Sequence, residues 1–276
     1  MQALGTLNNK KIVESAGSSK ALPSGQDVGG AFFLHLADTT LILSQRNSEW
    51  CGHGPILEQD IAITNISLDL LGQARNFYQY AATLINQSAD QLVNPATEDS
   101  LAYLRKEREF KNLLLVEQPN GDWGQTILRQ YLFSQFQYLL FEKLQNSNDE
   151  QIAAITTKAL KEITYHVRWS SEWVIRLGDG TAESHNRMLH ATDELWRYTG
   201  EMFVAAGYEK ETGIDFDVLK EAWDKKIKII FEEATLTVPE NTFMQSGGKE
   251  GRHTEQLGYI LTELQYMQRA YPNSEW

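Results

Sequence analysis

Apolar residues recur at intervals of three and four along most of the chain, which is the spacing of one face of an α-helix. Four long stretches carry this pattern, at residues 28–49, 63–84, 123–145 and 152–177. Gly52-His53-Gly54-Pro55 follows the first stretch, and Gly178-Asp179-Gly180 ends the fourth with a glycine stop. The pattern therefore predicts four long helices.

Shorter periodic stretches predict further helices at residues 98–116, 183–206, 215–234 and 254–269, with a loop at 235–251. The sequence contains no run with the alternation that is typical of strands. Residues 1–26 lack periodicity and are rich in Ser, Gly, Lys and Asn, so we expect a flexible extension. Residues 27–276 are expected to form a single all-α domain, in which additional C-terminal helices accompany four core helices.

The composition limits the partners of this domain. Its formal net charge is −12 over 276 residues. This charge argues against nucleic acid or an anionic membrane as the main partner, because either requires a broad basic surface. No segment resembles a signal peptide or reaches the about 18 to 20 apolar residues that cross a bilayer. We therefore expect a cytoplasmic protein.

Carboxylates and histidines on the long helices are the candidate chemistry. Bundles that hold two iron ions take a glutamate from two helices and a Glu-x-x-His pair from the other two. The chain offers Glu49, Asp69, and the pair Glu162 and His166, which is spaced i, i+4. Gly72 stands where the second helix would carry its histidine. The third helix places no carboxylate near its middle, so the set of iron ligands is incomplete.

Asp69, Glu162 and His166 have a plainer interpretation as a buried, hydrogen-bonded cluster, because buried charges are normally paired. Arg46 or Arg75 could supply the positive partner. Such a cluster would hold the helices in register without a metal ion.

Three other reactive side chains give weaker signals. His35 and His53 have no second donor at metal-binding spacing, so we expect them at a helix edge or in a loop. Cys51 is the single cysteine, which excludes an internal disulfide. We interpret it as a small buried residue.

Several short motifs follow one another along the chain. They are Leu43-Ser44-Gln45-Arg46, Glu49-Trp50-Cys51-Gly52-His53, Leu68-Asp69-Leu70-Leu71-Gly72-Gln73-Ala74-Arg75-Asn76-Phe77, Asn112-Leu113-Leu114-Leu115-Val116-Glu117-Gln118-Pro119-Asn120-Gly121, Lys161-Glu162, Tyr165-His166, Gly247-Gly248-Lys249, His253-Thr254-Glu255, Leu257-Gly258 and Gln268-Arg269. Each is weak alone, but the ordered collection is specific. In these motifs the chain resembles the structural C subunits of bacterial ring-1,2-phenylacetyl-CoA epoxidases, also called phenylacetate-CoA oxygenases, over residues 30–276.

The resemblance implies a ferritin-like helical bundle that has lost its metal and holds no cofactor of its own. It implies an A2C2 assembly with a catalytic A subunit, which holds the di-iron centre. A B subunit and a reductase with NADPH, flavin and iron–sulfur groups would complete the complex. The complex would convert phenylacetyl-CoA to its 1,2-epoxide in aerobic phenylacetate breakdown, with this chain as a non-catalytic scaffold.

Residues 105–112 mix basic side chains with an aromatic one and allow two interpretations. One is a solvated helix face with internal charge pairs. The other follows from the resemblance and places a CoA pocket at the A–C interface. In that pocket Arg108 and Lys111 could pair with phosphates. Phe110 or Asn112 could contact the carrier, and Glu109 belongs to the same candidate site.

Two further functions stay open. The chain could be an active di-iron or manganese oxidase that uses Glu49, Asp69, Glu162 and His166 together with water. It could also be a free-standing ferritin-like protein that binds a small apolar ligand between its helices. The third helix is apolar or aromatic around much of its circumference, which is more than one internal face requires and favours burial against a partner subunit.

Overall fold

Four long helices form the centre of the protein: α1 (Gly25–Ser48), α2 (Leu57–Gln87), α5 (Trp123–Leu144) and α6 (Glu150–Gly178). The structure, a computed structural model, describes residues 25–88, 95–272 and 274. Residues 1–24 of the predicted extension lie outside the described residues. Its last two positions, residues 25 and 26, are the first two of α1. The four periodic stretches of the sequence are thus the four longest helices.

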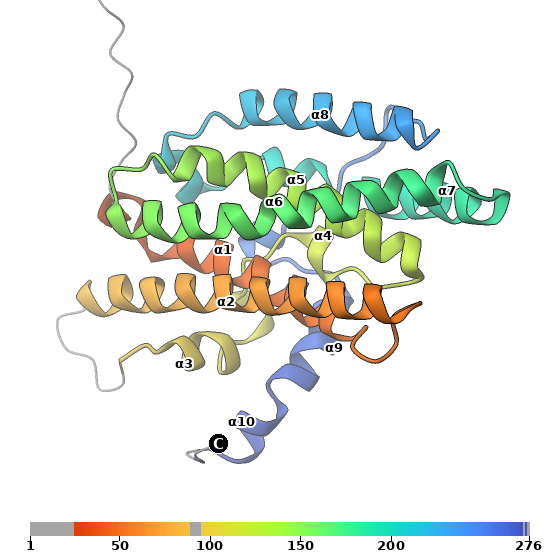
Figure 1. Ribbon diagram of the computed structural model, residues 1–276. Coiled ribbons are helices and arrows are strands. Elements are labelled where there is room, and N and C mark those ends of the chain that lie inside the picture. Colours follow the sequence, from red (N-terminus) through yellow and green to blue (C-terminus); the bar gives the residue numbers. More distant parts are fainter. Residues whose placement is uncertain (1–24, 89–94, 273, 275–276) are drawn as a thin grey trace, which may run out of the picture.

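The long helices are arranged as two antiparallel pairs. Within the first pair, Gly30 lies next to Ile85, and the Ser44 hydroxyl donates to the carbonyl oxygen of Ser67 at 2.8 Å, so α1 and α2 run in opposite directions. The α5–α6 pair packs across from α1–α2 (Figure 1). This arrangement is an all-α, ferritin-like bundle, and the described residues contain no strand. None of their helices has an apolar stretch long enough to cross a bilayer.

The chain's own C-terminal half covers the remaining sides of α5. Helices α7 (Ala182–Trp196) and α8 (Phe216–Glu233) both pack on it, as Figure 1 shows for α8 above the bundle. Trp223 donates from its indole nitrogen to the Leu132 carbonyl oxygen at 3.1 Å. The aromatic side chains around α5 therefore pack within this one chain. The prediction that they need a partner subunit to bury them was wrong.

The single helix predicted at residues 98–116 is three short elements: α3 (Glu98–Tyr103), η1 (Glu107–Glu109) and α4 (Leu114–Glu117). The backbone is extended at Phe110 and Leu113, where ψ is 152° and 142°. The Lys111 N–H between them donates to the Asp38 carboxylate of α1 at 2.8 Å. A distant carboxylate thus takes up a backbone donor that a continuous helix would have used, and the helix is interrupted.

Irregular connections dominate the last part of the chain. They contain η2 (Gly200–Phe203), η3 (Gly207–Thr212), η4 (Gly248–Glu250), α9 (Glu255–Leu264) and α10 (Tyr266–Ala270). The helix predicted to reach residue 206 ends at Trp196 and is followed, after a turn, by η2, and the one predicted at 254–269 is divided at Gln265. In Figure 1, α9 and α10 lead away from the bundle towards the C-terminus.

The start of α6 generates a prediction. The Asp149 carboxylate accepts hydrogen bonds from the Gln151 and Ile152 N–H groups at 2.9 and 3.1 Å, and it also accepts one from the Tyr80 hydroxyl. Asp149→Ala should lower the free energy of unfolding by about 1 to 2 kcal/mol, because helix N–H groups lose their acceptor. Asp149→Asn should retain most of the free energy of unfolding that Asp149→Ala loses. Urea denaturation measures both, and equal losses in the two variants would contradict the capping role.

Candidate functional site

Asp69 and His166 meet where α2 packs on α6. His166 Nε2 lies 3.0 Å from Asp69 Oδ2. The His166 side chain is fully buried, whereas 37 % of the Asp69 side chain is exposed. The pair therefore lies at the edge of the bundle and links two core helices. The expected contact between these two residues is present, but Asp69 is partly exposed and not buried as the cluster interpretation predicted.

Glu162 is held by amides and not by a cation. The Gln73 side-chain nitrogen donates to Glu162 Oε2 at 2.9 Å, and the Gln137 nitrogen donates to Gln73 Oε1 at the same distance. This chain of hydrogen bonds joins α6, α2 and α5. It places Glu162 close to the interior without a guanidinium beside it.

The arginines predicted to neutralise this cluster pair elsewhere. Arg46 Nη1 lies 2.9 Å from Glu49, and Arg75 Nε lies 3.0 Å from Glu98. Glu49 also accepts a hydrogen bond from the Asn120 side chain at 2.8 Å. Glu49 is therefore part of a surface contact at the end of α1, and the prediction that Arg46 or Arg75 would pair with Asp69 or Glu162 was wrong.

Gly72 does not face the bundle interior. It is exposed, and a Cβ built on it would meet no atom within 4 Å. The neighbouring Gln73 is 2 % exposed and points between the helices. The interior polar side chain nearest to Gly72 is therefore the amide of Gln73, one residue beyond the i+3 position at which the iron pattern has a histidine.

Neutral amides and a hydroxyl continue this interior polar layer. The Asn47 nitrogen of α1 donates to Gln130 Oε1 at 2.7 Å, and the Gln130 nitrogen donates to Ser134 Oγ at 2.8 Å. Together with Gln73 and Gln137 these residues connect three of the four long helices. Each has an exposed fraction of at most 2 %.

The donors in this layer do not fit a di-iron centre. Iron in ferritin-like bundles is bound by carboxylates, which neutralise its charge, and by imidazoles, and both are better ligands than amides. Across residues 25–88, 95–272 and 274, no group of three or more His, Cys, Asp or Glu side chains is arranged to hold a metal ion. The geometry instead provides hydrogen bonds that tie the helices together.

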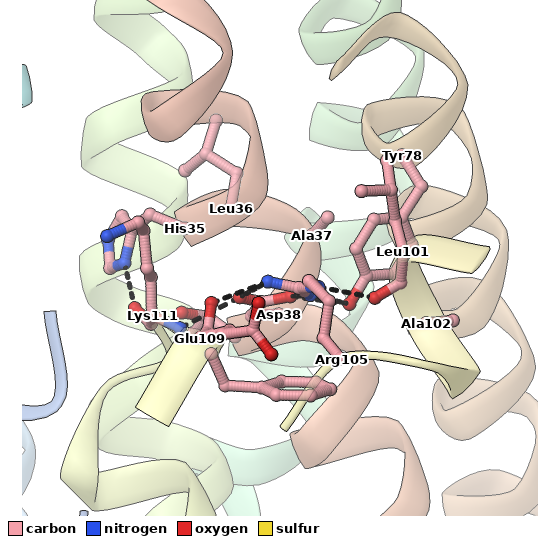
Figure 2. Close-up of polar contacts among 12 residues, drawn as sticks. His35, Leu36, Ala37, Asp38, Tyr78, Leu101, Ala102, Arg105, Glu109 and Lys111 are labelled. Carbon is pink, nitrogen blue, oxygen red and sulfur yellow. Dashed lines mark hydrogen bonds and ion pairs between the residues drawn. The ribbon is translucent and has the colours of Figure 1, made fainter. Parts of the chain in front are cut away.

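A second buried group lies between α1 and the segment that follows α3 (Figure 2). Asp38 is fully buried and accepts hydrogen bonds from the Arg105 guanidinium and, at 2.5 Å, from the Tyr78 hydroxyl. The guanidinium also lies 4.2 Å from the centre of the Phe110 ring. Burial lowers the pKa of Arg105, but the charges and hydrogen bonds of Asp38 and Tyr78 together outweigh it and raise the pKa above its ordinary value. The charged pair is therefore stable in the interior.

The structure changes the interpretation of residues 105–112. Phe110 and Asn112 are fully buried, so neither can contact a carrier molecule, and the segment is not a solvated helix face either. Lys111 is half-buried with its ammonium group 5.3 Å from the Tyr208 ring centre. Arg108 and Glu109 are exposed, and Glu109 accepts the Lys106 N–H at 2.7 Å.

His35 and Cys51 lie in the opposite environments to those expected. Cys51 is exposed in the turn after α1. His35 is 1 % exposed, with Nδ1 2.7 Å from the Lys111 carbonyl oxygen. Burial lowers its pKa. Its Nε2 lies 3.6 Å from Glu209, which pairs with the buried Lys249 at 2.8 Å.

Two more buried carboxylates hold the loop before α9. Glu117 accepts hydrogen bonds from the Thr254 N–H at 2.7 Å, and His253 Nδ1 lies 3.1 Å from its other oxygen. Glu201 accepts the Gly247 and Leu114 N–H groups at 2.7 and 2.8 Å. The motifs at residues 247–249 and 253–255 are thus attachment points of this loop.

Gly248 shows how closely the loop approaches the neighbouring segment. A Cβ on Gly248 would lie 2.3 Å from the Asn112 carbonyl oxygen, and one on Gly251 would lie 2.2 Å from that of Arg108. Gly251 also has a φ of 80°. Only glycine allows this contact between backbones.

The interior amides were missed by sequence reasoning that looked for carboxylates and histidines. A signal existed, because Gln130, Ser134 and Gln137 are spaced i, i+4, i+7 within an apolar helix. The buried role of Asp38 had no local signal, since its partners Tyr78 and Arg105 are 40 and 67 residues away.

Fold and site together define a ferritin-like helical protein whose bundle centre carries amides. The chain belongs to the family described as phenylacetic acid catabolic protein, whose model matches residues 24–276. It is also similar to the C subunit of 1,2-phenylacetyl-CoA epoxidase from Escherichia coli (strain K12). The two are 48% identical over 251 residues, covering 89% of this chain and 98% of the relative.

The Glu117–His253 contact generates a prediction of pH dependence. Burial lowers the pKa of His253, but the Glu117 carboxylate, with the Phe110 carbonyl oxygen and the Asp38 charge, outweighs it and raises the pKa above its ordinary value of 6.5. The charged form therefore stabilises the fold fully below pH 6.5, and this contribution is lost as pH rises through the folded-state pKa. The stability difference between the wild type and His253→Gln should be larger at pH 6 than at pH 8.5.

Urea denaturation at the two pH values measures this difference. His35, whose pKa is lowered, is present in both proteins, so its titration cancels in the comparison. A stability difference that is constant, or that grows with pH, would show that His253 is neutral in the folded protein.

Proposed function

We propose that this chain is the non-catalytic structural C subunit of a phenylacetyl-CoA 1,2-epoxidase. In this role it binds and stabilises a catalytic A subunit, which holds the di-iron centre and carries out the epoxidation. This chain would hold no metal and no other cofactor.

The amide layer is the observation that carries this proposal. Gln73, Gln137, Asn47 and Gln130 occupy the interior that di-iron bundles use for ligands, in a chain similar over nearly its whole length to the C subunit of an epoxidase. Buried carboxylates facing one another would need metal ions or protons to balance their charge. Neutral amides need neither, so the bundle can be stable without metal.

The proposal assigns the other components to other chains. An A2C2 core would receive electrons from a reductase that contains flavin and iron–sulfur groups and oxidises NADPH, and a B subunit would complete the complex. The Asp69–His166 and Gln73–Glu162 contacts would preserve the helix register of a metal-binding ancestor.

Metal analysis tests the assignment. The chain purified alone should contain well below one iron or manganese per molecule, because the interior offers amides. Co-expressed with its A subunit, the complex should contain about two irons per A–C pair. Elemental analysis against protein concentration measures both, and the A subunit purified alone shows which chain holds the iron.

Stoichiometric metal on the isolated chain would refute the non-catalytic role. The chain would then be an oxidase in its own right. If the A subunit neither binds this chain nor loses activity without it, the structural role fails as well.

Charge reversal at Arg108 tests whether the chain contacts CoA. Because Phe110 and Asn112 are buried, the predicted carrier contacts cannot form, which leaves the exposed Arg108 as a lone candidate contact. An isolated surface charge contributes little, so Arg108→Glu should change the affinity of the assembled complex for phenylacetyl-CoA less than twofold. Arg252→Glu, at an exposed arginine paired with Glu250, is the control for charge reversal on this face. A loss of tenfold or more in Arg108→Glu alone would restore the CoA contact.

A further inference from the structure

Helix α2 has a second apolar stripe that faces away from the bundle. Leu57, Ile61, Leu68 and Leu71 are 71 %, 52 %, 60 % and 44 % exposed. The core-facing stripe of the same helix, which includes Ile63, Ile66 and Leu70, is fully buried. We call the exposed set the outer seam, and nothing in the described part of the chain covers it.

The spacing of the outer seam indicates what would cover it. Its four residues follow one another at intervals of four, seven and three, and the half-buried Thr64 divides the interval of seven into three and four. Alternating intervals of three and four keep side chains in line for packing against a second α-helix. The seam extends over about 21 Å of helix, which is long enough for several turns of a partner.

Gly72 lies beside this seam and supports the same interpretation. Glycine within a helix lowers its stability relative to alanine. No intramolecular neighbour requires glycine here, because its Cβ would meet nothing within 4 Å. A helix from another chain that approaches closely would require it.

The charges around the seam indicate the character of the partner. Glu58 is exposed on the flank of the seam, and Asp69 exposes 37 % of its side chain on the same flank. Arg75, at the end of the seam, already pairs with Glu98 at 3.0 Å. A second copy of this chain, with a net charge of −12, would bring acidic residues towards acidic ones, so a helix with basic residues beside its apolar face fits better.

We propose that the outer seam of α2 is the docking surface for an amphipathic helix of the catalytic A subunit, with aliphatic residues at its seam and basic residues beside them. This inference rests on the proposed function and specifies where the two subunits meet. Gly72 provides the close approach between the two helices.

Paired double variants test the docking surface. Ile61→Glu/Leu71→Glu places two carboxylates in the seam. Ile229→Glu/Leu189→Glu is the matched control, because these residues lie on α8 and α7 and are 50 % and 42 % exposed, against 52 % and 44 % for the seam pair. Isothermal titration of each protein against the A subunit measures the affinity. The seam variant should lose about a hundredfold in affinity and the control less than threefold.

Gly72→Ala adds a test in which folding is not at risk. It should raise the unfolding midpoint of the isolated chain, because alanine favours helix, and lower the affinity for the A subunit at least fivefold. An increase in stability with unchanged affinity would show that no helix packs over Gly72.

The outcomes separate this inference from the function on which it rests. If the wild-type chain binds the A subunit and both double variants bind equally well, the surface is wrong and the structural role stands. If the wild-type chain does not bind the A subunit at all, the proposed function fails and the inference with it. If the seam variant instead turns a dimer of this chain into a monomer, measured by light scattering, the occupant is a second copy.

Discussion

A buried carboxylate must find donors or cations, and in this protein that requirement fixes the irregular half of the chain. Asp38, Glu117, Glu201 and Glu209 are at most 2 % exposed, and each is surrounded by backbone N–H groups, a cation or both. Transfer of an unpaired carboxylate to the interior is very unfavourable. The segments that provide the donors are therefore held against the bundle by these contacts.

Polar side chains in the bundle centre must also find hydrogen-bond partners, but few of them are carboxylates. Most of these side chains are amides, which carry both donors and acceptors and bond to one another without net charge. Among the described residues, the side-chain oxygens of Asn47 and Gln137 are buried without a hydrogen-bond partner. Asn47 with Gln130, and Gln73 with Gln137, each join two helices in this way. A bundle built on such contacts has a defined register, since an amide displaced by one turn would lose its partner.

The helices could be predicted from the sequence, because periodicity reports directly which face is buried. The position of Gly72 could also have been predicted, since a residue two positions from both Leu70 and Ala74 must lie on the opposite side of the helix. The interruption of the helix at 98–116 could not, because it depends on Asp38, which lies 73 residues before the Lys111 N–H that it accepts. The environments of His35 and Cys51 are set by which segments cover them, and that is likewise absent from the local sequence.

The contacts of Glu117 impose an order on synthesis. His253 and the Thr254 N–H, which bind its carboxylate, lie 136 and 137 residues further along the chain. While the ribosome is still making these residues, α1, α2, α5 and α6 can already associate, but the Glu117 carboxylate has neither partner. The nascent protein must therefore keep this side of the bundle open to water or to a chaperone until His253 and Thr254 have emerged, and only then can the carboxylate be enclosed.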